Sequence, residues 1–197
     1  MSAKKEVALA QAPSAARTWP FWVIVAVVTA IDFATKAAAV SALQPRHIPH
    51  RIIGDVVRFT LAYNPGAAFG MHLGPASRWI FACLSVVIIG VLLHATADLT
   101  RNSRLAAIGV PIVIGGALGN LLDRILQRDG VVDFIDIGVG TVRFWTFNAA
   151  DSAVTIGAVC LVIALWREEK QQVALERTRN ASPDRSTDEQ ATRQSRT

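Results

Sequence analysis

Apolar residues along this chain collect in four long runs, separated by more polar segments. The runs cover about residues 18–43, 77–99, 104–124 and 150–167. Each is close to the ~20 residues that a helix needs to cross the hydrocarbon core of a bilayer. Tryptophan rings favour the headgroup level of a membrane. Four tryptophans lie near the ends of the runs, at Trp19, Trp22, Trp79 and Trp166. The pattern predicts an all-α membrane protein with four transmembrane helices.

Two segments between the runs have a different pattern. Residues 44–76 contain a β-branched and aromatic stretch from Val56 to Tyr63, which is typical of strands. Residues 125–149 contain VVDFIDIGVGTVRFWTF, which indicates a short strand, a glycine turn and a second strand. Because one segment follows the first run and the other follows the third, both lie on the same membrane face. We expect them to pair into a small β cap there.

The two ends of the chain are polar and lack apolar periodicity. They comprise residues 1–17 and residues 168–197, and for the second we expect a frayed helix that runs into disorder. Twelve Lys and Arg residues lie in or next to the tails and the loop between the second and third runs, against seven in or next to the β-rich connections. Positive charge is in excess on the cytoplasmic side of membrane proteins. Both termini are therefore expected in the cytoplasm, with the β cap outside it.

The composition supports a membrane protein. Hydrophobic residues make up 52% of the 197 positions and charged residues only 18%, whereas a soluble domain has about 25% charged residues. The net charge is +5, but the basic residues are spread through tails and loops without interleaved aromatic residues, which argues against a nucleic-acid partner. Cys83 and Cys160 lie inside apolar runs, and the four histidines lack metal-ligand spacing. No metal or other cofactor is expected.

Asp32 and Lys36 are charged residues inside the first apolar run. Their spacing of four places them on one helix face, with the acid nearer the N-terminus, which is the better order for an ion pair. One interpretation is a structural pair in which the Lys36 side chain extends toward the membrane interface. The other is a role in orienting a substrate or a site. In both cases the acid should face the interior of the helix bundle.

The third run ends in GGALGNLLDR, where Gly115 and Gly119 form a small-residue face suited to close helix packing. Asn120, Asp123 and Arg124 follow on one helix face. An arginine interacts favourably with a helix C-terminus, but an aspartate there needs a partner. We expect a hydrogen-bonded scaffold at this end of the helix rather than residues that take part in chemistry.

Two turn-forming segments carry further polar residues. In NPGAAFG, residues 64–70, Asn64 precedes Gly66, which permits a backbone conformation or a close approach that other residues forbid. A plain turn is the alternative. In FNAADS, residues 147–152, Asn148 can cap a helix and Asp151 can complete a capping box three residues later.

Asp133 and Asp136 lie in the predicted strand VVDFID. They are an odd number of residues apart, so they point to opposite faces of that strand. Asp133 alternates with Val131 and Ile135, so an acid replaces an apolar residue on the face that should be buried. Asp133 is therefore the stronger candidate for a functional residue, and we expect Asp136 to have a supporting role.

Two functions fit this set of carboxylates. In the first, Asp133 and Asp151 share one proton, because two close acids do not both ionise readily. Asp151, at a helix N-terminus, is expected to be the charged member that activates a water. In the second, a small proton-coupled transporter uses Asp32, Asp123 and Asp151 as a relay. Most of the acids gather at one membrane face and no internal repeat is visible, which favours chemistry over transport.

Five motifs, taken together, resemble the lipoprotein signal peptidases (signal peptidase II), a family of bacterial membrane aspartyl proteases. The motifs are DFATK at 32–36, NPGAAFG at 64–70, GGALGNLLDR at 115–124, VVDFID at 131–136 and FNAADS at 147–152. The resemblance covers residues 18–167, which we take as the peptidase domain between the two tails.

The resemblance implies a fold and an activity. The fold would have four transmembrane helices and a small extracytoplasmic β-cradle. The enzyme would lie in the bacterial inner membrane with its active site near the outer leaflet. It would remove the signal peptide from a prolipoprotein by cleaving before a cysteine that carries a diacylglyceryl group, using no cofactor and acting as a monomer in contact with membrane lipid.

The resemblance also implies roles for particular residues. Asp133 and Asp151 would be the catalytic pair. The supporting and substrate-binding residues would be Asp32, Lys36, Asn64, Asn120, Asp123, Arg124 and Asn148. From the turn and strand patterns above, we add Gly66 and Asp136 to the supporting residues.

Overall fold

Four long helices dominate the computed structural model, which describes residues 18–68, 71–72, 74 and 76–181. They are α2 (Trp19–Ala42), α3 (Ser77–Thr100), α4 (Arg104–Leu126) and α5 (Ala149–Ala181). All four are long and apolar enough to cross a membrane. The prediction of four long apolar helices is confirmed.

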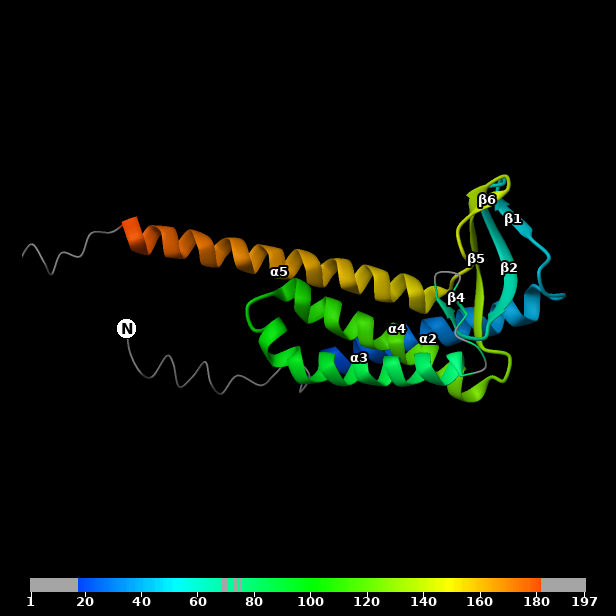
Figure 1. Ribbon diagram of the computed structural model, residues 1–197, viewed down its shortest axis with the longest axis horizontal. Coiled ribbons are helices and arrows are strands. Elements are labelled where there is room, and N and C mark those ends of the chain that lie inside the picture. Colours follow the sequence, from blue (N-terminus) through cyan, green and yellow to red (C-terminus); the bar gives the residue numbers. More distant parts are fainter. Residues whose placement is uncertain (1–17, 69–70, 73, 75, 182–197) are drawn as a thin grey trace, which may run out of the picture.

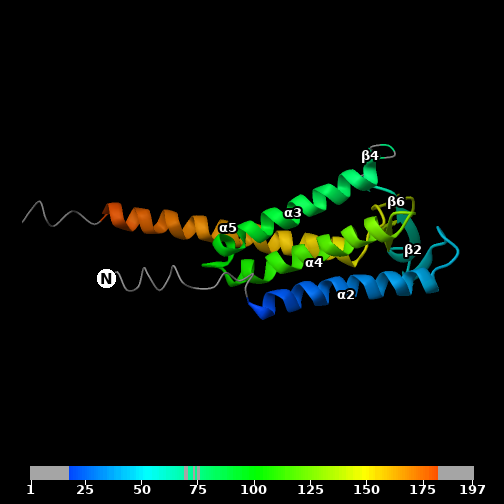
Figure 2. The same ribbon diagram turned by 90° about the horizontal axis from the view of Figure 1, so that it is seen from below.

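Helix α4 is the centre of the bundle. Its apolar window is 67% buried, against 22% or less in each of the other three helices. Figure 2 shows α4 between α2 and α3. The predicted small-residue face explains the contact with α2, because a Cβ atom on Gly115 would lie 2.8 Å from Val28 Cβ and one on Gly119 would collide with Asp32. Larger residues there would force the two helices apart.

An antiparallel sheet covers one end of the bundle (Figure 1). Its strands, in spatial order, are β1 (His50–Ile53), β2 (Val57–Asn64), β5 (Val131–Val139) and β6 (Val142–Arg143). A separate two-stranded ladder joins β3 (Ala67–Ala68) to β4 (Met71–His72). The predicted β cap is therefore confirmed, and both of its β-rich segments contribute to one sheet.

A small hydrophobic core fixes the sheet to the bundle. Leu61, Val132 and Phe134 of the sheet are buried against Ala39 and Leu43 at the end of α2. Burial of large aliphatic and aromatic side chains is worth roughly 1.5–3 kcal/mol each. The sheet is thus held at a fixed depth relative to the helix ends.

Helix α5 continues well beyond the apolar run that was expected to end near residue 167. It has 33 residues, a length of about 50 Å, and it extends past the other helices in Figure 1. The polar tail, expected as a frayed helix that runs into disorder, is helical over residues 168–181. Residues 1–17 and 182–197 lie outside the described part of the chain.

Candidate active site

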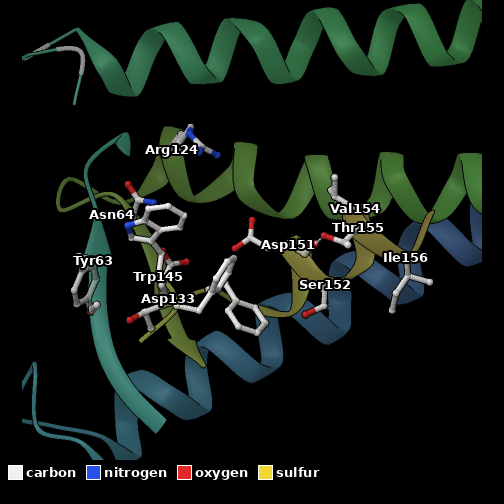
Figure 3. Close-up of a pocket in the computed structure, with 14 residues that line it drawn as sticks. Tyr63, Asn64, Arg124, Asp133, Trp145, Asp151, Ser152, Val154, Thr155 and Ile156 are labelled. Atoms are coloured by element: carbon white, nitrogen blue, oxygen red, sulfur yellow. Dashed lines mark hydrogen bonds between the residues drawn. The ribbon is translucent and has the colours of Figure 1, made fainter. Parts of the chain in front are cut away.

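Asp133 and Asp151 line the same pocket at the junction of the sheet and the bundle (Figure 3). The pocket has a volume of about 810 Å³. Asp133 comes from β5 and Asp151 from the first turn of α5. The other lining residues are Ala62, Tyr63, Asn64, Arg124, Phe144, Trp145, Thr146, Phe147, Ser152, Val154, Thr155 and Ile156. The two carboxylates therefore meet in a cavity with one polar and one apolar part.

The start of α5 holds the Asp151 carboxylate in place. The Asp151 N–H donates to Asn148 Oδ1 at 3.0 Å, and the Asn148 N–H donates to Asp151 Oδ2 at 3.1 Å. These two bonds form the predicted capping box. The residue has a third hydrogen bond, in which Asp151 Oδ1 accepts from Asn120 Nδ2 at 2.8 Å. Both carboxylate oxygens thus have fixed donors.

Asp133 is only 4% exposed, as expected for an acid on a buried strand face. Its Oδ1 accepts a bond from Asn148 Nδ2 at 2.7 Å, and Asn64 supplies a further side-chain hydrogen bond. Burial, followed by the nearby charge of Asp151, raises the pKa of Asp133 from 3.8 to about 7. Asp133 can therefore carry a proton near neutral pH, and Asn148 contacts both acids.

The raised pKa of Asp133 predicts a pH-dependent stability. The folded protein holds this proton more tightly than the unfolded chain, so the contribution of Asp133 is fully present below about pH 4 and is lost as the pH rises through about 7. The Asp133→Asn variant lacks this titration. We expect its melting temperature to rise relative to the wild type by on the order of 5–10 °C between pH 4 and pH 8. A difference that stays constant across this range would contradict the assignment.

Lys36 lies at the centre of a buried ion-pair network behind the pocket. Its Nζ lies 2.7 Å from Asp32 Oδ2, 3.0 Å from Asp123 Oδ2 and 2.9 Å from Asn120 Oδ1. The Lys36 side chain is 3% exposed. The predicted Asp32–Lys36 pair is confirmed, but the interpretation in which Lys36 extends to the membrane interface is wrong. Two carboxylates and an amide together offset the cost of burying this ammonium group.

The same network fixes the two elements that carry the candidate catalytic acids. Asp32 Oδ1 accepts the N–H of Ala150, at the start of α5, at 2.9 Å. Asp123 Oδ2 accepts the N–H of Val132, the neighbour of Asp133, at 3.1 Å. Asp123 thus has the partners that its place at a helix C-terminus requires. Lys36, by holding both acids, connects the backbone positions of β5 and α5.

Arg124 and Asn64 border the pocket from different elements. Arg124 Nη1 donates to Asn120 O at 3.0 Å, while its buried Nε has no hydrogen-bond partner in the part of the chain that the structure describes. Asn64 Oδ1 accepts the N–H of Gly66 at 3.0 Å. Gly66 has a φ of 116° and lies so close to α3 that a Cβ would be 2.6 Å from Ser77 Cβ. Gly66 thus shapes the turn that presents Asn64.

Asp136 belongs neither to the pocket nor to the ion-pair network around Lys36. Its Oδ1 accepts a bond from Arg143 Nε at 2.6 Å, and Thr60 Oγ1 donates to its Oδ2 at 3.3 Å. Arg143 also donates to the backbone oxygen of Asp55 at 2.8 Å. Asp136 therefore joins β5 to β6, next to the pocket wall.

Sequence reasoning missed two groups of residues. The first is the aromatic wall of Phe144, Trp145 and Phe147, whose rings stack edge to face. Its signal was the aromatic density of FWTF before the fourth span. The second is Arg78, which donates to three backbone oxygens at the end of α4, on Arg124, Ile125 and Arg128. No local pattern identifies that long-range contact.

The described residues include no group of three or more His, Cys, Asp or Glu side chains placed to hold a metal ion. The polar groups of the pocket are two carboxyl groups with amide and guanidinium donors around them. One acid is buried with a raised pKa, and the other is held by three hydrogen bonds at a helix N-terminus. Such a pair can divide the roles of acid and base.

Comparison with known proteins identifies the family. A model described as signal peptidase (SPase) II matches residues 24–167. A lipoprotein signal peptidase of Geobacillus kaustophilus (strain HTA426) is 37% identical over 147 residues, 74% of this chain and 92% of the relative. One from Halothermothrix orenii (strain H 168) is 40% identical over 152 residues, 76% of this chain and 97% of the relative.

Solved structures support the same assignment. A bacterial membrane enzyme solved at 2.3 Å resolution superposes with a TM-score of 0.65 at 28% identity, over 84% of this chain and 93% of that structure. A second, at 1.9 Å resolution, gives a TM-score of 0.64 at 30% identity, over 74% of this chain and 92% of that structure. The matched region includes all four spans and the sheet between them, and the chain belongs to the signal peptidase II family.

Proposed function

We propose that Asp133 and Asp151 are the catalytic pair of this signal peptidase II. The enzyme is an aspartic peptidase that cleaves signal peptides from lipid-modified prolipoproteins. The observation that carries the assignment is that these two acids, from separate elements, line one pocket and share Asn148 as a hydrogen-bond partner.

The two acids divide the reaction between them. Charged Asp151 removes a proton from a water, and the water oxygen forms a bond to the carbonyl carbon of the scissile peptide. Asp133 gives its proton to the carbonyl oxygen, which produces a neutral tetrahedral intermediate. When that intermediate collapses, Asp151 gives the proton it took from the water to the amine nitrogen, the C–N bond breaks, and Asp133 takes back a proton from a hydroxyl of the intermediate, so the pair returns to its singly protonated form.

The pocket contains groups suited to hold an extended peptide. Among the described residues the Arg124 Nε has no hydrogen-bond partner, and the guanidinium group lines the pocket, so its N–H groups can donate to a substrate carbonyl. Asn64 forms a hydrogen bond with Asp133 and also lines the pocket, so its amide group can bind the substrate backbone. Correct placement of the scissile bond relative to the two acids accounts for a large part of the rate in such enzymes.

The apolar part of the pocket fits a substrate that lies partly in lipid. Phe144, Trp145 and Ile156 line it, and Ile156 is on the exposed face of a membrane-spanning helix. We propose that the bond cleaved is the one before the lipid-bearing cysteine, at the outer leaflet of a bacterial inner membrane. With the active site at that leaflet, both termini would lie in the cytoplasm. Because one chain carries both acids, a monomer would be sufficient for catalysis.

A comparison of matched substrates tests this function. Purified enzyme should cleave a prolipoprotein that carries a diacylglyceryl cysteine and should leave the same chain without the lipid essentially uncut. The cleaved product should begin with the modified cysteine, which mass spectrometry can establish. Equal rates on the two substrates would refute the lipid requirement, and a different N-terminus would refute the proposed cleavage position.

The transporter alternative has no support in the geometry. Lys36, whose side chain is 3% exposed, binds two of the three relay acids, Asp32 and Asp123, in a buried network. Those contacts hold the backbone of β5 and α5 in place. Only Asp151, of the three, lines the pocket.

A further inference from the structure

The far end of the sheet, which we call the sheet tip, consists of residues 52–57 and 137–142. These are the turn that joins β1 to β2 and the hairpin that joins β5 to β6. The Gly138 N–H donates to Val56 O at 2.9 Å, and the Gly140 N–H donates to Asp55 Oδ2 at 3.0 Å. The two turns are therefore one structural unit.

The sheet tip exposes a group of aliphatic side chains that no part of the described chain covers. Their exposed fractions range from 47% to 80%, and they are Ile52, Ile53, Val56, Val139 and Val142. Isolated exposed apolar residues are common on protein surfaces, but several on two turns that are bonded to each other indicate a contact surface. Such a group on a short projecting sheet would also favour aggregation if it were left in water.

The position of the sheet tip indicates what it contacts. The sheet lies across the end of the bundle, and the turns of β1 and β6 project past α5 in Figure 1. If the four helices cross a bilayer, the projecting turns of the sheet therefore lie over the surface of that bilayer. The outer face of α5 is exposed and apolar at Ile156 and Val159. Phe144 and Trp145 lie in the short connection between the sheet tip and the start of α5, and both are more than half exposed.

We propose that the sheet tip inserts into the boundary between headgroups and acyl chains of the adjacent leaflet. The lipid-exposed surface of α5 then continues through Phe144 and Trp145, whose rings suit the headgroup level, to the aliphatic residues of the tip. Asp55 limits the depth: it is paired with Arg58, and an ion pair is costly to carry into hydrocarbon. Arg51, three-quarters exposed and 3.7 Å from Asp55, can reach lipid phosphates.

The insertion has a consequence for the active site, and this consequence rests on the proposed function. Arg143 connects the sheet tip to Asp136 on β5, and the next two residues, Phe144 and Trp145, form part of the pocket wall. An inserted tip would hold that wall at a constant depth in the bilayer. A lipid-tethered substrate presents its scissile bond at a similarly constant depth.

Spin-label accessibility tests the insertion independently of catalysis. Single cysteines would replace Ile53, Val142 and, as a control, the half-exposed Asp129, in full-length protein with Cys83→Ala and Cys160→Ala changes. In nanodiscs of phosphatidylethanolamine and phosphatidylglycerol, labels at 53 and 142 should be relaxed by oxygen and shielded from a nickel chelate. The label at 129 should show the opposite. Nickel accessibility at 53 and 142 equal to that at 129 would overturn the proposal.

A charge substitution separates insertion from other uses of the same surface. Val142→Asp should raise KM for a lipidated substrate about fivefold in nanodiscs, with little change in detergent, and should leave the melting temperature unchanged because the side chain is 80% exposed. Val142→Leu should match the wild type. An equal loss in nanodiscs and detergent would indicate direct contact with substrate, and a change in oligomeric state would indicate contact with a second copy; either result refutes lipid insertion.

Discussion

Asp133→Asn and Asp151→Asn should each reduce cleavage of a lipidated prolipoprotein by at least about a thousandfold. General acid and general base catalysis each contribute about 10²–10⁴ to a rate, and an amide can neither accept the proton from water nor donate one to the carbonyl oxygen. Asparagine keeps the size of aspartate and can still accept the bond from Asn148 that each acid now receives. The measurement is product formation over time in detergent, with enzyme and substrate purified.

The control for this prediction is Asp129→Asn, the same chemical change at an exposed residue whose only described ion pair is with Arg46. It should cleave at the wild-type rate. Both active-site variants should remain folded, and Asp133→Asn should be at least as stable as the wild type near neutral pH. Cleavage within tenfold of the wild type by either variant would exclude that residue from the chemistry.

The parts of the fold that depend on local pattern were predictable. Four apolar runs of nearly membrane-spanning length gave four helices, and alternating β-branched residues gave the strands of the cap. The capping box of Asn148 and Asp151 was also predictable, because its donors and acceptors lie three residues apart. The buried place of Asp133 followed from the period of a strand.

The parts that depend on contacts between distant segments were not predictable. From the sequence, the Lys36 side chain could extend either toward the membrane interface or into the bundle. Its orientation depends on Asp123, which lies in another helix. The Arg143 partner of Asp136 appears only once the hairpin register is known. A helical start to the polar tail was expected, because residues 168–181 are rich in Glu, Lys, Gln and Arg, which have high helix propensities, but without apolar periodicity the sequence does not show how far the helix continues.

Lys36→Met should destabilise the protein more than any other single change at this network. Methionine fills a similar volume but leaves Asp32 and Asp123 buried without their counterion. Removal of one partner from a buried ion pair typically costs about 3–5 kcal/mol, which corresponds to a drop in melting temperature on the order of 10 °C for a chain of this size. Thermal unfolding in detergent, followed by differential scanning fluorimetry, measures the drop.

The paired change Asp32→Asn tests whether this loss comes from unpaired charge. Asparagine can still accept the Ala150 N–H through its side-chain oxygen, so the start of α5 stays anchored. The double variant Lys36→Met/Asp32→Asn should therefore be less destabilised than the sum of the single variants, because each change removes the partner that the other leaves unpaired. Additive losses would mean that Lys36 stabilises the fold by packing alone. Non-additive losses would mean that the charge interaction between Lys36 and Asp32 stabilises the fold, and Asp32 is the residue that holds the start of α5, the helix that carries Asp151.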